Sequence, residues 1–382
     1  MAAKKSGKSN GFIRFIRVIF ILLNVAAVIL LGGSYLAPWI SPVKNAWLPF
    51  TGLAYPLLVL LNLGFVIAWL FFNWRWSLLS LLALAAGFFQ IRNHFQLSGE
   101  HIFSENEFPV KVMSYNVRNF DMYNYKNDWS YTFDNRNKIY DYLHNENADI
   151  LCFQEFVHDL TGEFKTIDTI PEFQKAVNIH AEYTFTSRKI IQFGISTFTA
   201  FPIVGKGRID FENSAHNLCI YTDMLIREDT VRVYNAHFES IHFGKQEYEL
   251  AEDLSEAAAS DSHQKAGRRM LSLLKAAFAD RAAQVEKVAE HIGQSPYPVI
   301  LCTDLNDTPA SYAYRRLSSG LDDAFVKSGR GMGTTYQRIF PGFRIDYIFH
   351  SSDCSSYNCR VRSLDYSDHY PVVCDIIIKE NE

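Results

Sequence analysis

Aspartate and glutamate are absent from the first 99 residues of this 382-residue chain, whereas the remainder contains 41 of them. The same stretch holds three apolar runs, at residues 12–31, 53–72 and 76–91. An α-helix needs about 20 mostly apolar residues to cross the hydrocarbon core of a bilayer. Neither a soluble helical bundle nor a cleaved signal peptide needs three such runs without one acidic residue. The sequence therefore predicts a membrane region over residues 1–98 with about three transmembrane helices.

The basic residues near the first apolar run predict how this region is oriented. Five of the eight basic residues in the region precede or open that run, whereas the loop at residues 32–52 contains only Lys44. Lysine and arginine are enriched on the cytoplasmic side of membrane proteins, so the N-terminus is expected in the cytoplasm. Three crossings then place the rest of the chain outside the cytoplasm, while two crossings would return it to the cytoplasm. The lipid bilayer is the expected partner, and no protein partner is predicted.

Residues 110–382 have the pattern of a separate α/β domain, and a polar, acidic linker at residues 99–109 precedes it. Segments with period-two alternation are interleaved with helical segments, which predicts a mixed sheet covered by helices. Residues 245–267 form a predicted insertion that is charged and rich in alanine and serine. This insertion is either a solvated helix or a mobile flap over the site, and the composition favours the helix.

Six strand ends or turns of this domain carry polar side chains. The clearest is the stretch at residues 299–309, where an apolar strand is followed by Asp-Leu-Asn-Asp and a proline. A buried strand holds such side chains rigidly while the following loop leaves them open to a substrate, although the same residues also suit a simple turn. The residues delivered in this way are Asn116, Glu155, Asn235 with His237, Asp304 with Asn306, Asp346, and Asp368 with His369.

The chemistry of these side chains predicts a metal site. Glu155, Asp304, Asp368 and the carboxamide of Asn116 are hard oxygen donors, which select Mg²⁺, Mn²⁺ or Ca²⁺ rather than zinc. A metal and a charged imidazole that converge on one point would stabilise a phosphoryl group that gains negative charge in its transition state.

The histidines of the set leave alternatives open. Asp346 could fix the tautomer of His369 and stabilise its imidazolium form, or could instead pair with the nearby Arg344. His237 could contact a substrate or could be a structural, hydrogen-bonded histidine.

The six cysteines predict little about the chain's chemistry. Cys152, Cys302 and Cys374 lie in apolar runs and are expected to be small buried side chains. Cys354 and Cys359 flank a short polar loop and could form a disulfide in an oxidising compartment.

Taken together and in this order, the motifs resemble those of the endonuclease/exonuclease/phosphatase superfamily of metal-dependent phosphoesterases. The resemblance covers about residues 110–378 and implies a four-layered α/β sandwich, in which two mixed β-sheets face each other and helices cover them outside. The matching segments are Ser114-Tyr115-Asn116, residues 149–155, Asn235-Ala236-His237, Asp304-Leu305-Asn306, residues 344–348 and Ser367-Asp368-His369.

The resemblance also implies roles for the site residues. Glu155 would be the main ligand of Mg²⁺, with Mn²⁺ as the alternative metal, and Asn116 and Asp368 would lie near the metal. Asp304 would position or deprotonate the attacking water.

The phosphate group would be held by a second set of residues. The resemblance implies that Asn306 and His237 bind phosphate oxygens, and that His369, paired with Asp346, stabilises the developing charge.

Two positions depart from the family's pattern. Cys302-Thr303 precede Asp304 where a glycine is usual. Arg118 follows Asn116 by two residues, where some apurinic-site endonucleases carry an aspartate, and this weakens the match to those DNA-repair enzymes.

The charge of the domain discriminates among substrates. The chain from residue 100 carries all 41 acidic and 29 of the 37 basic residues, a net charge of -12. A nuclease gains most of its nonspecific affinity from basic residues that neutralise phosphates. The sequence therefore favours a phosphodiesterase or phosphatase that acts on a lipid head group or small phosphoester over an extracytoplasmic DNA or RNA nuclease. A catalytically silent protein that binds a phosphorylated ligand is the third hypothesis.

Overall fold

The structure, a computed structural model, describes residues 6–125, 131–212, 214, 216–240, 261–336 and 342–379. The chain forms two compact units. The first comprises residues 1–92 with 310–312, and the second comprises residues 93–309 with 313–382.

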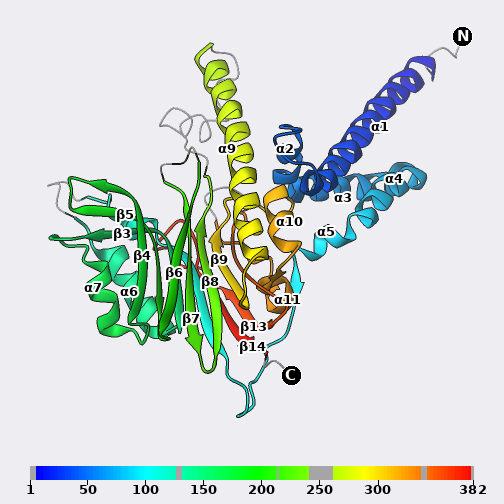
Figure 1. Ribbon diagram of the computed structural model, residues 1–382. Coiled ribbons are helices and arrows are strands. Elements are labelled where there is room, and N and C mark those ends of the chain that lie inside the picture. The colour runs from blue at the N-terminus through cyan, green and yellow to red at the C-terminus, as the bar shows by residue number, and fades with distance from the viewer. Residues whose placement is uncertain are drawn as a thin grey trace, which may run out of the picture. The chain divides into compact units, whose positions relative to one another are not determined.

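The first unit is helical, and its helices are drawn in blue in Figure 1. They are α1 (Ser6–Leu36), the 3₁₀ turn η1 (Ala37–Trp39), α2 (Leu48–Leu53), α3 (Tyr55–Phe72), α4 (Trp74–Ala86) and α5 (Phe88–Arg92).

Two segments of this unit, Gly11–Trp39 and Tyr55–Phe72, are long and apolar enough to cross a membrane. Length and composition are the grounds for this, and a signal sequence near the N-terminus meets the same criteria. The third apolar run differs from the prediction because it divides at Gly87 into α4 and α5. The 13 residues of α4 extend only about 20 Å, which is shorter than the hydrocarbon core of a bilayer.

A buried polar network joins three helices of this unit. Asn24 on α1 donates from Nδ2 to Ser80 Oγ on α4 at 2.6 Å, and Ser80 Oγ donates to Asn62 Oδ1 on α3 at 3.0 Å. The Trp69 indole also donates to Asn24 Oδ1, at 2.9 Å. The side chains of Asn24, Asn62 and Ser80 are fully buried. Hydrogen bonds of this kind hold helices together in apolar surroundings, so α4 is part of the same bundle as α1 and α3.

The second unit is built on two six-stranded sheets, each of which mixes parallel and antiparallel pairs. The first sheet has the strand order β13-β14-β2-β3-β5-β4 and the second has the order β10-β12-β9-β8-β7-β6. The strands of the first sheet are β2 (Val110–Asn116), β3 (Ile150–Asp159), β4 (Asn178–Ser187), β5 (Ile191–Thr199), β13 (Cys354–Val361) and β14 (Val372–Ile378). The strands of the second are β6 (Ile203–Asp210), β7 (Leu218–Ile226), β8 (Asp229–His237), β9 (Val299–Asp304), β10 (Asp322–Asp323) and β12 (Asp346–His350). β1 (Gln96–Leu97) and β11 (Arg330–Gly331) form a separate antiparallel pair.

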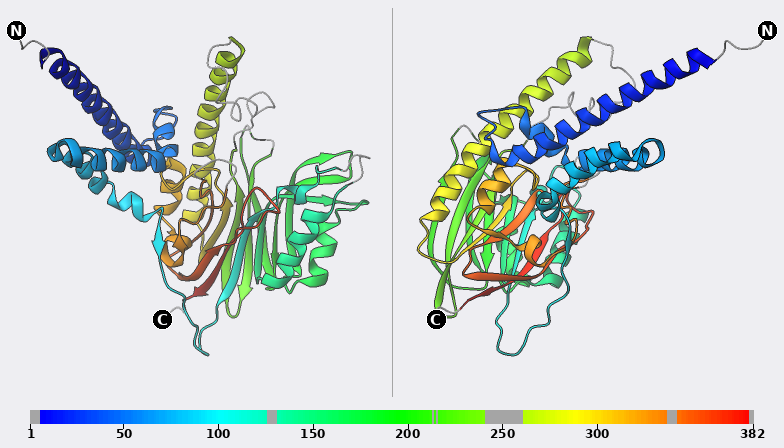
Figure 2. Two further views of the ribbon diagram at one scale, coloured as in Figure 1. Left: turned by 180° about the vertical axis from the view of Figure 1, so that it is seen from behind. Right: turned by 90° about the vertical axis from the view of Figure 1, so that its right-hand side faces the viewer.

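Helices cover the outer face of each sheet. They are α6 (Asp134–Glu146), α7 (Thr166–Phe173), α9 (Asp261–Gly293) and α10 (Tyr312–Ser318), whereas α11 (Ala324–Ser328) packs with the core between the sheets. Between the sheets, Val112 and Ile150 pack with Val233 and Ile300 in one apolar core. A second core joins α6 and α7 to the first sheet, and a third joins α9 and α10 to the second. Figures 1 and 2 show these helices beside their sheets. The predicted four-layered sandwich is therefore confirmed.

The structure describes the predicted linker at residues 99–109 in full but the predicted insertion at residues 245–267 only in part. Residues 99–109 have little regular structure but are attached to the second unit, because the backbone of His101 exchanges two hydrogen bonds with the side chain of Asn358 on β13. Residues 241–260, which include most of the predicted insertion at 245–267, lie outside the described part of the chain. The insertion's last seven residues begin α9, which continues to Gly293.

The disulfide in the structure joins Cys359 on β13 to Cys374 on β14. The suggested pairing of Cys354 with Cys359 is therefore wrong. Cys374 is buried, as predicted, but it is also the partner of Cys359, which the sequence did not reveal. Cys354 is buried and free. The register of β13 and β14 shifts between Tyr357 and Arg360, which sets Cys359 against its partner, and sequence spacing cannot reveal such a register.

Candidate active site

Three neighbouring strands of the second sheet place polar side chains in one row. His237 on β8 is opposite Asp304 on β9 in a parallel pairing, and Asp346 on β12 is opposite the same Asp304 in an antiparallel pairing. Residues paired across adjacent strands point to the same face of a sheet. All three side chains are buried. The ladder between β9 and β12 runs without a break to Asp304, although Cys302 and Thr303 stand where the family has a glycine.

The facing sheet contributes Asn116 and Glu155. Asn116 is the last residue of β2, as predicted. Glu155 does not end its strand, because β3 continues to Asp159. The ladder with β5 instead shifts register between Phe153 and Phe156, and Glu155 adopts a left-handed backbone with φ of 45°. A β-bulge of this kind bends the strand and redirects a side chain, which explains why a residue inside a strand can reach the site.

Asn116 connects the two sheets at the site. Its Nδ2 donates to Glu155 Oε1 at 3.0 Å and to Asp304 Oδ2 at 2.8 Å. Its Oδ1 accepts a hydrogen bond from the backbone N–H of Arg118 at 3.0 Å. In this arrangement Asn116 orients two carboxylates, and its role as a direct metal ligand stays a prediction.

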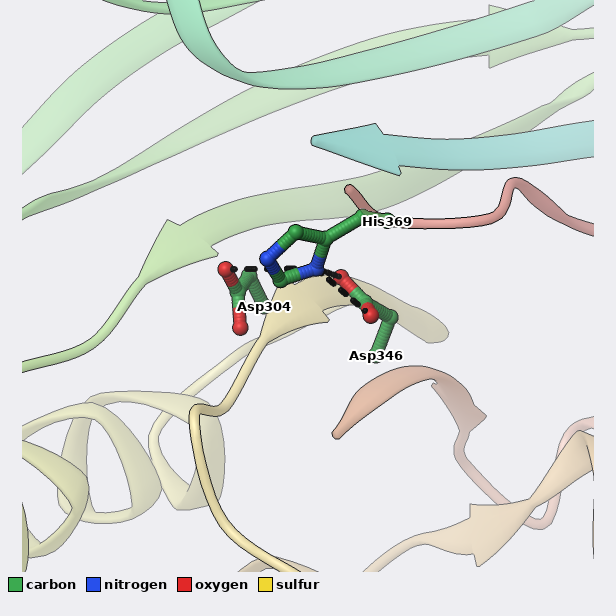
Figure 3. Close-up of side chains that lie close together, drawn as sticks. All are labelled: Asp304, Asp346 and His369. Atoms are coloured by element: carbon green, nitrogen blue, oxygen red, sulfur yellow. Dashed lines mark hydrogen bonds and ion pairs between the residues drawn. The ribbon is translucent and has the colours of Figure 1, made fainter. Parts of the chain in front are cut away.

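His369 is buried and pairs with Asp346. Its Nδ1 lies 3.1 and 3.0 Å from the two carboxylate oxygens of Asp346 and 3.9 Å from Asp304 Oδ2 (Figure 3). Burial disfavours the imidazolium form, but the Asp346 and Asp304 carboxylates outweigh it and raise the pKa of His369 to about 10. The other candidate partner of Asp346, Arg344, is paired with Asp323 at 2.6 Å. The structure therefore favours the His369 pairing over the Arg344 alternative.

Asp304 lies at the centre of the cluster and is fully buried. Burial and the neighbouring Asp346 carboxylate raise the pKa of Asp304, although His369, His237 and the Asn116 hydrogen bond lower it. A carboxylate with a raised pKa is a stronger base than an exposed one, which suits removal of a proton from water.

Asn306 lies two residues beyond Asp304 in the loop after β9. Its backbone is left-handed, with φ of 54°, and its N–H donates to Asp304 Oδ1 at 3.0 Å. Its Nδ2 donates to the carbonyl oxygen of Phe238 at 3.1 Å, which links the ends of β8 and β9. Leu305 between them is fully buried in the core that joins α9 to the second sheet. The proposed contact of Asn306 with a phosphate oxygen stays a prediction.

Comparison with known families identifies this constellation. The model of the Endonuclease/Exonuclease/phosphatase family matches residues 113–369, about two thirds of the chain. The chain belongs to the endonuclease/exonuclease/phosphatase family. A second model, for a domain of unknown function (DUF8431), matches residues 17–94. No curated protein matches the chain.

Solved structures share the endonuclease/exonuclease/phosphatase fold. A protein of this family from Beutenbergia cavernae is 17% identical and has a TM-score of 0.50, with 71% of this chain and 72% of that chain covered. A second, from Bacteroides vulgatus, is 16% identical and has a TM-score of 0.49, with 72% of this chain and 100% of that chain covered. At these identities the likeness concerns the fold alone.

Asp368 is close to Arg118. Its Oδ2 is 3.6 Å from Arg118 Nε, and Arg118 Nη1 is 3.6 Å from Asp121. These residues adjoin a pocket of about 380 Å³ that includes Asn135 and Ser367. Arg118, a departure from the pattern of some family members, is thus an ion-pair neighbour of the predicted metal ligand. The role of Asp368 as a ligand stays a prediction.

The residues at the site fit the divalent metal on which the endonuclease/exonuclease/phosphatase superfamily depends. Among the described residues, Asp304, Asp346 and His369 have ligand atoms within 4.8 Å of one another. A second set faces them, because His237 Nε2 lies 3.6 Å from Asp304 Oδ2 and 3.9 Å from Glu155 Oε1. His237 Nε2 is buried without a hydrogen-bond partner, so it is free to meet a substrate oxygen. Since Asp346 already holds His369, the carboxylate of Glu155 is the donor we expect to face Mg²⁺ or Mn²⁺.

Sequence reasoning missed Arg281, a buried residue of α9 that holds two site loops. Its guanidinium donates to Asp307 Oδ2 at 2.9 Å and to the carbonyl oxygen of Glu239 at 2.9 and 2.7 Å. Asp307 follows Asn306, and Glu239 follows the end of β8 that carries His237. No motif marks this arginine, because its partners are 42 and 26 residues away.

Asn235, which precedes His237 in the family motif, has a structural role. It is buried between the sheets, where its Oδ1 accepts from Gln154 Nε2 at 2.8 Å and its Nδ2 donates to the carbonyl oxygen of Ser196 at 2.9 Å. Asn235 therefore helps to hold the two sheets together behind the site.

Proposed function

We propose that the chain is a membrane-attached hydrolase of phosphoesters that uses a divalent metal, Mg²⁺ or Mn²⁺. The observation that carries this proposal is the position of Asp304, a buried carboxylate with a raised pKa between His237 and the His369–Asp346 pair. Glu155 from the facing sheet completes the cluster through Asn116.

Each residue has a distinct task in the proposed reaction. A metal held by Glu155 and its neighbours would supply positive charge to the phosphoryl oxygens. Asp304 accepts a proton from the attacking water, and the unpartnered Nε2 of His237 contacts a phosphoryl oxygen. The imidazolium of His369, which Asp346 stabilises, offsets the negative charge that develops in the transition state.

A silent binding protein is the weaker candidate. Recognition of a phosphorylated ligand requires donors such as His237 but no base in contact with water. A buried carboxylate beside a second carboxylate costs folding free energy, and catalysis gives a reason to keep Asp304 next to Asp346.

Metal removal and a substrate panel test the proposal. We expect the purified full-length chain in detergent to hydrolyse at least one of DNA, phospholipid and inositol phosphate with Mg²⁺, and to lose this activity with a chelator. The variant His369→Gln should lower the rate without changing the metal dependence. Turnover that resists the chelator would contradict the metal mechanism, and inactivity on every phosphoester would contradict the function.

The substrate predicted from net charge, a lipid head group or small phosphoester, stays a prediction. A nuclease is the second candidate, and one observation favours it: the exposed rings of Tyr123 and Phe185 both stack on Phe193, close to the site residues. Such rings suit unpaired bases.

We propose that α4 and α5 together form a third crossing and that the catalytic domain lies outside the cytoplasm. The burial of Ser80 of α4 in the network with Asn24 and Asn62 supports a bundle of three helices. The Cys359–Cys374 disulfide supports an oxidising compartment. A C-terminal reporter that is active only outside the cytoplasm should be active, whereas a silent reporter of normal abundance would favour two crossings.

A further inference from the structure

Four aromatic rings form a row on the surface of the second unit. The rings of Tyr123 and Phe193 are nearly parallel, with centroids 6.3 Å apart and an interplanar angle of 6°. The centroid of Phe185 lies 5.9 Å from that of Phe193, with an interplanar angle of 27°. His216 meets Phe185 edge-on, at 6.4 Å and 73°. We call these four residues the ring row. Tyr123 is 64% exposed and Phe185 is 49% exposed.

The ring row adjoins strands that carry site residues. Phe193 on β5 pairs with Val157 on β3, two residues beyond Glu155. His216 lies two residues before Leu218, which pairs with His237. The row therefore lies at the end of each sheet where Glu155 and His237 are found.

Two cations lie at the same edge of the molecule. Arg188 and Lys189 form the exposed turn between β4 and β5, the strands that carry Phe185 and Phe193. Both have a left-handed backbone, with φ of 49° and 65°, as tight hairpin turns require. Burial raises the pKa of Tyr131, and Arg188 is near enough to oppose that increase. The turn therefore adds positive charge beside aromatic rings in a domain whose net charge is -12.

We propose that the ring row is a stacking platform for the unpaired bases of a single-stranded nucleic acid. This inference rests on the proposed hydrolase function and names its substrate class. Exposed rings in succession, with cations that can follow a phosphate backbone, are the elements by which proteins bind single strands without sequence preference. The parallel orientation of Tyr123 and Phe193 favours a planar ligand over a lipid surface, since insertion into lipid requires no stacking between rings.

The inference reverses the order of substrates predicted from net charge. A domain with a charge of -12 repels a polyanion at long range, so stacking has to supply more of the binding free energy than phosphate contacts do. Binding is therefore expected to weaken little as salt concentration rises, in contrast to a typical basic nuclease.

Binding of a matched pair of oligonucleotides tests the platform. The full-length chain in detergent, carrying Asp304→Asn to prevent turnover, is titrated with fluorescent oligothymidylate and with a strand of the same length whose residues are abasic. Adding Tyr123→Ala or Phe185→Ala should raise the Kd for oligothymidylate at least about fivefold, because each change removes one base–aromatic stack. The Kd for the abasic strand should stay the same.

A control variant separates stacking from general surface effects. Tyr297→Ala removes a partly exposed aromatic ring two residues before β9, at the end of that strand away from Asp304, and should leave both Kd values unchanged. The inference is overturned if Tyr123→Ala binds oligothymidylate with the Kd of the parent, or if its Kd for the abasic strand rises by the same factor as its Kd for oligothymidylate. The inference is also overturned if Tyr123→Ala still binds oligothymidylate but no longer binds anionic phospholipid vesicles, because the ring row would then be a lipid-binding surface. Failure of the hydrolase function shows separately, as absence of turnover by the chain with Asp304 intact.

Discussion

Replacing Asp304 with asparagine should lower kcat about 10³-fold while leaving the folded structure at least as stable as the parent. The large loss follows because general bases contribute about 10² to 10⁴ in rate and Asp304 lies 3.6 Å from His237 and 3.9 Å from His369. Stability should not fall, because the change removes a buried negative charge whose pKa is raised by burial and by Asp346. Steady-state kinetics on the substrate found in the panel and thermal unfolding in chelator measure the two effects.

A second buried aspartate provides the matched control. Asp323 pairs with the buried Arg344 at 2.6 Å and caps α11, and it contributes no group to the proposed reaction. Asp323→Asn breaks a buried ion pair, so it should cost about 3 to 5 kcal/mol of stability and leave kcat of the folded fraction near the parent value. If both variants lose stability and activity together, Asp304 is a structural residue and the base assignment is wrong.

Replacing Glu155 with glutamine should remove the response of the protein to Mg²⁺. Glutamine keeps the shape of the side chain but not its charge, and the side chain is one-third exposed, so the fold should tolerate it. Metal that binds only the folded state stabilises it by about 2.7 kcal/mol at a concentration of 100 times Kd, which raises the unfolding temperature of the parent. Glu155→Gln should lose this increase, and its kcat/KM should fall about 10³-fold at low Mg²⁺ and recover in part at high Mg²⁺.

Glu182 on β4 is the control for this change. Its carboxylate is about as exposed as that of Glu155, and it pairs with Arg208 away from Asp304. Glu182→Gln should keep the full response to Mg²⁺. An undiminished response in Glu155→Gln would show that the metal is held elsewhere.

The strand ends could be predicted from the sequence because they depend only on residues that are adjacent in the chain. A buried strand is a short apolar run, and a polar residue that follows it directly, as Asp304 follows Thr303, is visible without any tertiary information. The same argument found Asn116 and His237, whereas the pairing of Asp346 with His369 was one of two alternatives that the sequence left open. The layered fold followed from the alternation of strands and helices.

The remaining features depend on contacts between distant segments. The bulge at Glu155 depends on the register of β3 against β5, and the partner of Cys359 depends on the register of β13 against β14. Arg281 reaches loops from another helix, and the ring row gathers Tyr123 and Phe185 from segments that are far apart in sequence. Hydrophobic periodicity and composition do not reveal contacts between segments that are far apart in sequence. If the ring row binds bases, net charge alone ranked the lipid or small phosphoester above nucleic acid wrongly.

The row of His237, Asp304 and Asp346 across β8, β9 and β12 makes activity depend on correct strand pairing. Because side chains alternate between the two faces of a strand, a slip of one residue between β8 and β9 would turn His237 away from Asp304, and a slip between β12 and β9 would turn Asp346 away from it. Either slip leaves the chain without a complete site. The catalytically competent fraction of a preparation should equal its correctly paired fraction, so titration of active sites would serve as a direct count of correctly folded molecules.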